Sequence, residues 1–150
     1  MTHFWFYVTS LENWHRIVQQ KAIGIPKYNR HKIEMVKTGE QIVTYLKGEM
    51  TIAGVLEATS EPYVDETPLF TGDIFPYRIS VILRYVAENR LSFDKKLILQ
   101  LDFIKNKARW VSHIQGKNSF RELSENDFQR ILVHLRPCDS VKVLGNPSSY

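Results

Sequence analysis

The sequence predicts an α+β fold in which helices pack around a curved, barrel-like sheet. The chain opens with an aromatic and β-branched segment, strand-like segments dominate its middle, and helical segments are inserted between them. This order lacks the regular strand–helix alternation of a doubly wound parallel sheet. With 150 residues and 17.6 kDa, the chain fits one domain that can bury a full apolar core.

The first strand and first helix are predicted close to the start of the chain. Residues 4–8 are all aromatic or β-branched, which favours a buried central strand. Thr9 precedes Glu12 by the spacing of a capping box. Apolar residues then recur at helical intervals, so we expect a helix that ends near Gln20.

A loop and a hairpin are expected next. Gly24 and Pro26 indicate a loop, and the basic segment behind it leads to a short helical turn at residues 33–36. Residues 41–47 and 50–59 alternate apolar and polar side chains on either side of a Lys-Gly-Glu link. This pattern predicts two antiparallel strands.

The second half of the chain is expected to mix strands and helices. Residues 73–83 have strand character, although Pro76 confines that strand to an edge or a bulge. Apolar spacing predicts a helix at residues 97–104, and the pattern returns to a strand at residues 109–114.

A final helix is predicted from its cap at Ser124 to its end at Pro137. We expect residues 1–137 to form the single domain. Residues 138–150 are expected to be a poorly ordered tail.

Composition sets mild limits on function. The net charge of +4 and the pI near 9.2 slightly favour a polyanionic partner. A single cysteine, Cys138, excludes an internal disulfide framework and a cysteine-based zinc site. The sequence shows no signal peptide and no apolar run of membrane-spanning length, so we expect a cytoplasmic protein. The sequence does not determine the oligomeric state, for which a monomer is the expectation.

Signals for catalysis are weak. Asp65 and Glu66 are adjacent carboxylates that point in different directions, which is typical of a solvated loop rather than a metal site. Ser112 and His113 are neighbours without the frame of a nucleophile and its base. No known catalytic, phosphate-loop or dinucleotide motif occurs. We therefore expect a protein without enzymatic activity, cofactor or metal.

Residues 103–120 carry the strongest functional signal. Three cations precede Trp110, and a histidine, a glycine and hydroxyl groups follow it. Cations suit phosphates, and a flat indole suits a nucleobase. We favour a pocket role for Trp110 because its neighbours are charged or polar. A second basic segment, residues 27–32, is by itself more typical of a solvated face.

Nearly the whole chain also resembles a known family, the EVE domains. The resemblance rests on ordered motifs: Phe4-Trp5-Phe6-Tyr7-Val8-Thr9-Ser10 with Glu12-Asn13-Trp14, Gly24-Ile25-Pro26-Lys27, Ile52-Ala53-Gly54-Val55, Ser60-Glu61-Pro62-Tyr63-Val64-Asp65, Phe75-Pro76-Tyr77-Arg78-Ile79, and Phe103-Ile104-Lys105-Asn106-Lys107 with Arg109-Trp110, His113 and Gly116. The resemblance implies a PUA-like fold, a small twisted β-barrel with surrounding helices. It also implies kinship with YTH and ASCH domains and a pocket for a modified nucleotide, for which a modified cytosine is expected, in DNA or RNA.

Carried onto this chain, the resemblance implies a base pocket and flanking phosphate contacts. The implied pocket residues are Thr9, Ser10, Asn13, Trp14, Gly24, Ile25, Pro26, Tyr63, Tyr77, Trp110 and His113. The implied phosphate-binding residues are Lys27, Arg30, Lys105, Lys107, Arg109 and Lys117. The chain departs from its relatives at Ile23, where they often carry a tryptophan that helps cage the base.

Two alternatives to a modified-base reader stay open. Because Ile23 offers no stacking face, the protein could be a general RNA-binding accessory domain without selectivity for a modification. A small enzyme that acts on a nucleotide, with His113 and Asp65 as its catalytic pair, is the third hypothesis, and no spacing in the sequence favours it.

Overall fold

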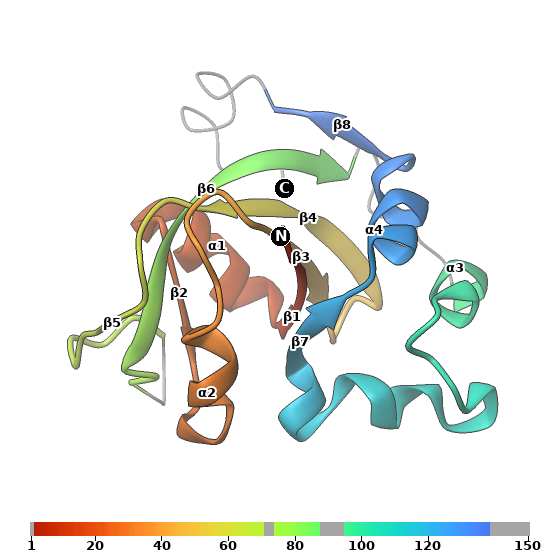
Figure 1. The fold of residues 1–150 in the computed structure, drawn as a ribbon, viewed down its shortest axis with the longest axis horizontal. Coiled ribbons are helices and arrows are strands. Elements are labelled where there is room, and N and C mark those ends of the chain that lie inside the picture. The colour runs from red at the N-terminus through yellow and green to blue at the C-terminus, as the bar shows by residue number, and fades with distance from the viewer. Residues whose placement is uncertain (1, 71–73, 88–94, 139–150) are drawn as a thin grey trace.

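Eight strands form one curled sheet in the computed structural model, which describes residues 2–70, 74–87 and 95–138 (Figure 1). The main strand order is β2-β6-β4-β3-β1-β7, with β5 and β8 also paired to β6. The strands are β1 (Phe4–Thr9), β2 (Ala22–Ile25), β3 (Gln41–Leu46), β4 (Thr51–Ala58), β5 (Tyr63–Val64), β6 (Tyr77–Ala87), β7 (Phe120–Leu123) and β8 (Leu135–Pro137).

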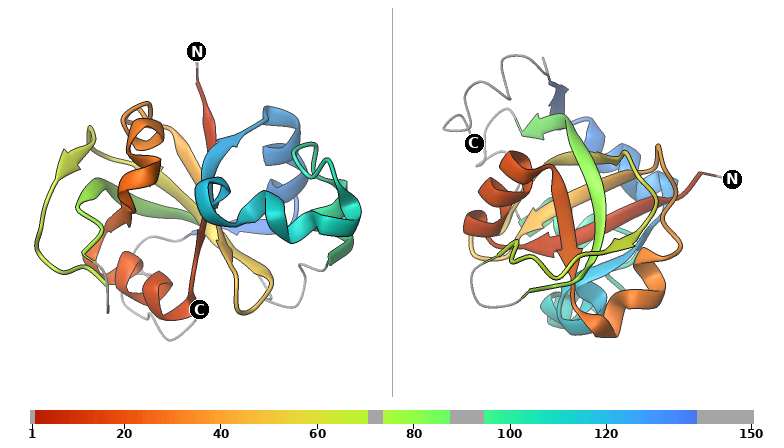
Figure 2. Two further views of the ribbon diagram at one scale, coloured as in Figure 1. Left: turned by 90° about the horizontal axis from the view of Figure 1, so that it is seen from below. Right: turned by 90° about the vertical axis from the view of Figure 1, so that its left-hand side faces the viewer.

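The sheet is mostly antiparallel and strongly bent. Only the pairing of β1 with β3 is parallel among the described strands. Irregular registers occur at Thr44/Tyr45 in β3 and at Val55/Leu56 in β4. Such bulges increase local twist and bend a strand. The sheet is therefore curled instead of flat (Figure 2).

Helices cover both faces of the curled sheet. The helix α1 packs against one face, and α3 and α4 lie beside the other (Figure 1). The helices are α1 (Leu11–Gln20), α2 (Arg30–Ile33), α3 (Lys95–Gln100) and α4 (Glu125–Leu132), with 3₁₀ helices η1 (Lys27–Asn29), η3 (Lys107–Ile114) and η4 (Gly116–Ser119). No helix among the described residues is long and apolar enough to cross a membrane.

The central strand β1 contributes side chains to two hydrophobic cores. Trp5 and Tyr7 point into the core that contains α1, whereas Phe6 points into the core that contains α3 and α4. This alternation follows from the two-residue period of a strand. It explains why residues 4–8 are apolar throughout: the strand is buried on both faces.

Several sequence expectations are confirmed. The α+β class is correct, and so are the first strand, the first helix and the antiparallel pair formed by β3 and β4. The strand expected at residues 73–83 starts only at Tyr77, directly after Pro76, and runs on to Ala87. Residues 71–73 lie outside the described residues.

Other expectations are wrong for identifiable reasons. Residues 109–114, expected as a strand, belong to η3, which is closed by local bonds such as the Ser112 hydroxyl donating to the Arg109 carbonyl at 2.7 Å. The last helix ends at Leu132 rather than Pro137, because residues 135–137 pair with β6 as β8.

The basic segment at residues 27–32 is helical. Gly24, expected in a loop, belongs to β2. The basic segment that follows forms η1 and α2, so its helical turn comes earlier than the one expected at residues 33–36. The tail expected from residue 138 lies outside the described residues from 139 onward.

Candidate functional site

A cavity of about 540 Å³ opens where the end of β1 meets β2, the β3–β4 turn and the segment from η3 to η4. A volume of this size is typical of small-molecule sites. Six rings contribute to its lining: Tyr7, Tyr28, Tyr45, Phe70, Phe75 and Trp110. Aromatic walls of this density suit a flat, planar ligand.

The junction of β1 and α1 supplies polar groups to the cavity. Thr9, Ser10 and Asn13 all line it. The Ser10 hydroxyl caps α1 by accepting the Asn13 backbone N–H at 3.1 Å. The Asn13 side-chain amide has no hydrogen-bond partner among the residues that the structure describes, so its donor and its acceptor remain available to a ligand.

The segment Gly24-Ile25-Pro26 forms one wall of the cavity. The Tyr7 hydroxyl donates to the Gly24 carbonyl at 3.0 Å and fixes this wall to β1. A β-carbon at Gly24 would lie 2.8 Å from the Phe75 carbonyl oxygen, so only glycine permits this approach. The absence of a side chain at Gly24 therefore sets the distance between two walls.

Trp110 lies between the cavity and a hydrophobic core. It is 8% exposed, packs in the core that contains α3 and α4, and also lines the cavity. Trp110 therefore has both roles: it packs in a hydrophobic core and it lines the cavity. The segment that carries Trp110 is stabilised by Asn106, whose side chain accepts the Arg109 backbone N–H at 3.2 Å.

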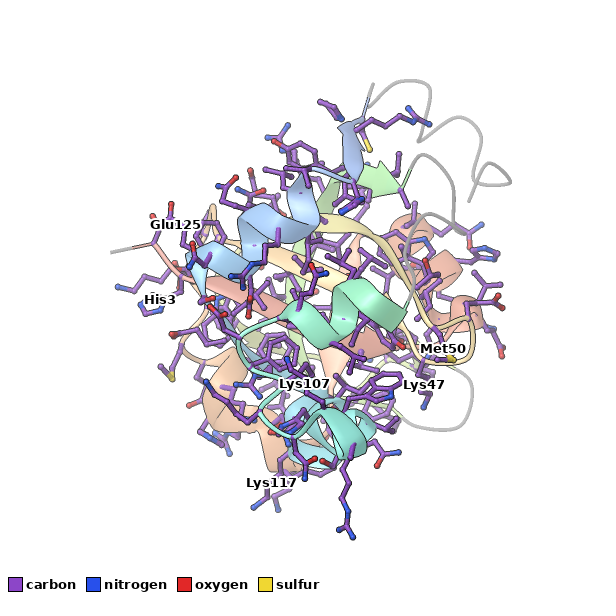
Figure 3. The ribbon with its side chains drawn as sticks, turned by 90° about the vertical axis from the view of Figure 1, so that its right-hand side faces the viewer. His3, Lys47, Met50, Lys107, Lys117 and Glu125 are labelled. Carbon is purple, nitrogen blue, oxygen red and sulfur yellow. The ribbon has the colours of Figure 1, made fainter. Side chains whose placement is uncertain are left out.

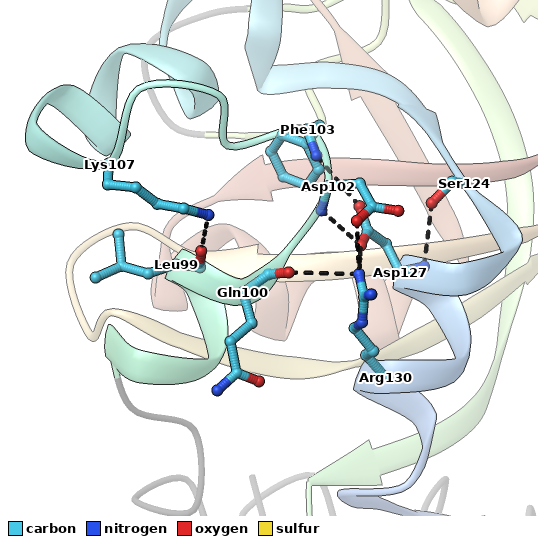
Figure 4. A network of polar contacts seen from close by, with 8 residues as sticks. All are labelled: Leu99, Gln100, Asp102, Phe103, Lys107, Ser124, Asp127 and Arg130. Atoms are coloured by element: carbon cyan, nitrogen blue, oxygen red, sulfur yellow. Dashed lines mark hydrogen bonds and ion pairs between the residues drawn. The ribbon is translucent and has the colours of Figure 1, made fainter.

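A buried carboxylate anchors the beginning of this segment. Asp127 in α4 accepts the backbone N–H of Asp102 at 2.7 Å and that of Phe103 at 3.4 Å (Figure 4). Arg130 donates to Asp127 at 2.8 Å and to Asp102 at 2.8 Å. Hydrogen bonds to ionised groups are stronger than neutral ones. The network fixes the position of the chain between α3 and η3, which leads to Trp110.

Two tyrosine hydroxyls in the cavity wall have pKa values above their usual range. Burial raises the pKa of Tyr7, although a hydrogen bond with the Thr9 side chain opposes the rise. Burial raises the pKa of Tyr45 to about 12. Tyr45 is 1% exposed, and its hydroxyl has no hydrogen-bond partner among the described residues. Both hydroxyls are therefore neutral and suit a neutral ligand edge.

The rim of the cavity is apolar and exposed. Tyr28, Met50 and Val111 line the cavity and are 49%, 47% and 39% exposed, respectively. They come from three separate segments, η1, the β3–β4 turn and η3. Lys47 lies in the same turn as Met50 (Figure 3). Exposed apolar groups around a pocket mark an interaction surface.

The structure separates the remaining implied pocket residues from the cavity. Trp14 is fully buried in the core. Tyr63 and Tyr77 belong to β5 and β6, and Tyr77 lies 5.1 Å beneath the Arg30 guanidinium. The His113 Nε2 accepts the backbone N–H of Asn106 at 3.0 Å, which closes η3. None of these four side chains lines the cavity.

Ile23 is fully buried in the same core as Trp14. It does not line the cavity either, whereas its neighbours Gly24 and Ile25 do. Most of the aromatic lining therefore comes from rings that were not among the implied pocket residues: Tyr7, Tyr28, Tyr45, Phe70 and Phe75. Because these rings come from separate segments, no local sequence pattern predicts that they meet around one cavity.

The implied phosphate-binding cations are dispersed. Arg30 donates to Glu34 at 2.7 Å, and the Lys107 ammonium donates to the Leu99 carbonyl (Figure 4). Neither side chain lines the cavity, and the other implied cations do not line it either: Lys27, Lys105, Arg109 and Lys117.

This architecture is that of a PUA-like domain, and the chain belongs to the EVE domain family, whose model matches residues 3–134. It is 35% identical over 142 residues to UPF0310 protein PH1033 of Pyrococcus horikoshii, covering 85% of this chain and 95% of that protein.

Solved structures of low sequence identity share the fold. The human THYN1 protein, in complex with DNA containing 5-methylcytosine, matches with a TM-score of 0.60, 18% identity, and coverage of 88% of this chain and 96% of that chain. The YTH domain of the Zygosaccharomyces rouxii MRB1 protein, in complex with N6-methyladenosine RNA, matches with a TM-score of 0.63, 15% identity, and coverage of 88% and 85%.

Proposed function

We propose that the protein is a non-enzymatic reader that binds a modified nucleotide, with a modified cytosine as the first candidate, in the cavity beside Trp110. The observation that carries this proposal is one cavity that combines aromatic walls with the Asn13 side-chain amide, which has no hydrogen-bond partner among the described residues. The folds of THYN1 and the MRB1 YTH domain, solved with 5-methylcytosine DNA and N6-methyladenosine RNA, support it.

The chemistry of the cavity fits an extruded base. A base that leaves the stack loses its neighbours, and aromatic side chains replace them. Trp110 and the other rings of the lining offer such faces, and the Asn13 amide and the Tyr45 hydroxyl offer hydrogen bonds to a base edge. A methyl group on the base would pack against apolar walls such as Phe75, at a gain of about 0.8 kcal/mol per buried carbon.

A screen of free nucleosides tests this proposal. We expect one modified nucleoside to raise the melting temperature more than its unmodified counterpart, because a ligand that binds only the folded state stabilises it. An Asn13→Ala variant should lose most of that shift, since the base edge loses its amide partner. Arg136→Gln, on the exposed strand β8, serves as the control. No shift for any nucleoside would refute the proposal.

A general nucleic-acid-binding domain is the alternative. It would bind modified and plain strands equally, with affinity set by phosphate contacts and a steep salt dependence. A nucleotide-processing enzyme receives less support. Asp65 accepts the Thr67 backbone N–H at 2.8 Å and pairs with Arg78 at 3.5 Å, whereas His113 is bonded within η3.

A further inference from the structure

We infer that Lys32, Lys117 and Arg121 form a phosphate-binding site beside the cavity, through which the protein holds the backbone of a single-stranded nucleic acid whose base occupies the cavity. This inference rests on the proposed function. It assigns the backbone contact to these three cations rather than to Lys105, Lys107 and Arg109.

The fold brings two sequence-distant basic segments into contact. The Lys32 ammonium, next to the end of α2, donates to the backbone carbonyl of Lys117 in η4. Nearby, the Asn29 amide lies 3.5 Å from the Ser119 hydroxyl. Figure 3 shows Lys117 at the edge where α2 and η4 meet. The two segments therefore form one continuous basic surface.

Arg121 extends this surface from β7. Its guanidinium carbon lies 4.4 Å from the centre of the Phe103 ring, which holds the side chain in place. A cation that is already ordered loses less conformational entropy when it binds a phosphate. Arg121 therefore adds a preorganised donor to two lysines.

The three positive charges repel each other, and no acidic side chain of the described residues lies at hydrogen-bond distance from them. Burial lowers the pKa of Lys32, and the charges of Arg121 and Lys117 lower it further. Burial also lowers the pKa of Arg121, although the charge of Asp127 opposes this. No ion pair involves the three cations within the described ranges. A bound phosphate would relieve this repulsion.

The position relative to the cavity favours a phosphate of the same nucleotide or its neighbour. Gly116 and Ser119 line the cavity and flank Lys117 in the chain, and Tyr28 lines it one helical turn before Lys32. A base in the cavity must leave its sugar and phosphates at the opening. The basic surface begins at that opening, so the strand runs from the cavity across α2 and η4.

The salt dependence of binding tests the inference. The probe is a single-stranded nonamer with one central 5-methylcytosine or N6-methyladenosine, in deoxyribose and ribose forms. Each phosphate contact contributes about 0.7 to the slope of log affinity against log salt for single strands. The double variant K32Q/K117Q should lower the magnitude of this slope by about 0.7 to 1.4. Its affinity for the free nucleoside should stay at the wild-type value.

Controls separate the possible failures. Arg136→Gln removes an exposed charge on β8, on the opposite side of the molecule from α2 (Figure 1). An unchanged slope in K32Q/K117Q, or an equal fall in R136Q, would overturn the inference and leave the proposed function intact. If the wild-type protein bound the nonamer no more tightly than the free nucleoside, the inference would also be overturned and the proposed function would stand. Wild-type protein that binds neither probe would contradict the proposed function itself.

The single variant Lys117→Gln provides a test that does not depend on the folding of the double variant. The Lys117 side chain is exposed and makes no hydrogen bond among the described residues. Lys117→Gln alone should therefore fold and melt like the wild-type protein and lower the slope by about 0.7. A melting curve of each variant is recorded before the titrations. A wild-type slope in this single variant would also count against the inference.

Discussion

Replacing Gly24 by alanine should push the Gly24 and Phe75 walls of the cavity apart and destabilise the protein. A β-carbon at this position would meet the Phe75 carbonyl oxygen at 2.8 Å, the Phe75 β-carbon at 3.1 Å and the Leu69 side chain at 3.4 Å. The first contact involves backbone, so a rotamer change cannot relieve it. Gly24 or the segment around Phe75 must move.

The expected magnitude follows from the cost of overpacking. Inserting a methyl group into a tightly packed site costs about 1–3 kcal/mol. For a protein of this length each kcal/mol lowers the melting temperature by roughly 2–4 °C, so a fall of about 2–12 °C is expected. Ligand affinity should fall as well, because Phe75 is itself a wall of the cavity.

The assay is thermal unfolding followed by circular dichroism, with Gly48→Ala as the matched control. Gly48 also lines the cavity, but no atom lies within 4 Å of its β-carbon position. The control should melt at the wild-type temperature or slightly above it. If Gly24→Ala melted like Gly48→Ala, the close approach between the two walls would be refuted.

Three further predictions concern the cavity and its supports. Trp110→Leu keeps apolar bulk but removes the stacking face, so oligonucleotide binding should weaken by about 1–3 kcal/mol in fluorescence anisotropy titrations; unchanged affinity would place the base elsewhere. Asp127→Ala leaves the amides of Asp102 and Phe103 without an acceptor, which should cost roughly 1–3 kcal/mol for each in denaturant unfolding, and a wild-type midpoint would argue against the network. Burial alone would raise the pKa of Glu40, but hydrogen bonds from Trp5 and two backbone amides outweigh it and lower the pKa below the ordinary value of 4.5. The wild-type protein should therefore have a larger free energy of unfolding than the Glu40→Gln variant above pH 4.5, and this difference should vanish as the pH falls through the folded-state pKa of Glu40. A difference that stays constant across this pH range would contradict the prediction.

The sequence predicted the elements whose signal is local. The buried strand at residues 4–8 and the β3–β4 hairpin follow from short patterns of apolar residues. The cap of α1 was expected one residue too early: Ser10, not Thr9, accepts the backbone N–H of the first turn. Residues 109–114 and 135–137 were predicted wrongly. Residues 135–137 pair with β6, a partner far along the chain that no local pattern contains. Residues 109–114 are closed into η3 by local bonds such as that from the Ser112 hydroxyl to the Arg109 carbonyl, which apolar spacing does not register.

The site was predicted only in outline. The residues at the end of β1, the Gly24 wall and Trp110 do meet around one cavity. The rings that complete it, such as Phe70 and Phe75, come from the segments between β5 and β6, whose path over the cavity depends on the whole fold. The meeting of Lys32 with Lys117 likewise depends on tertiary packing, because these residues are 85 positions apart.

A matched pair of oligonucleotides tests the central claim most directly. The two strands differ by a single methyl group on the central base, and their dissociation constants are measured by fluorescence anisotropy at one salt concentration. Burial of one methyl group in the cavity predicts that the modified strand binds at least about four times more tightly. Equal affinity for every matched pair, in both DNA and RNA, would contradict the account.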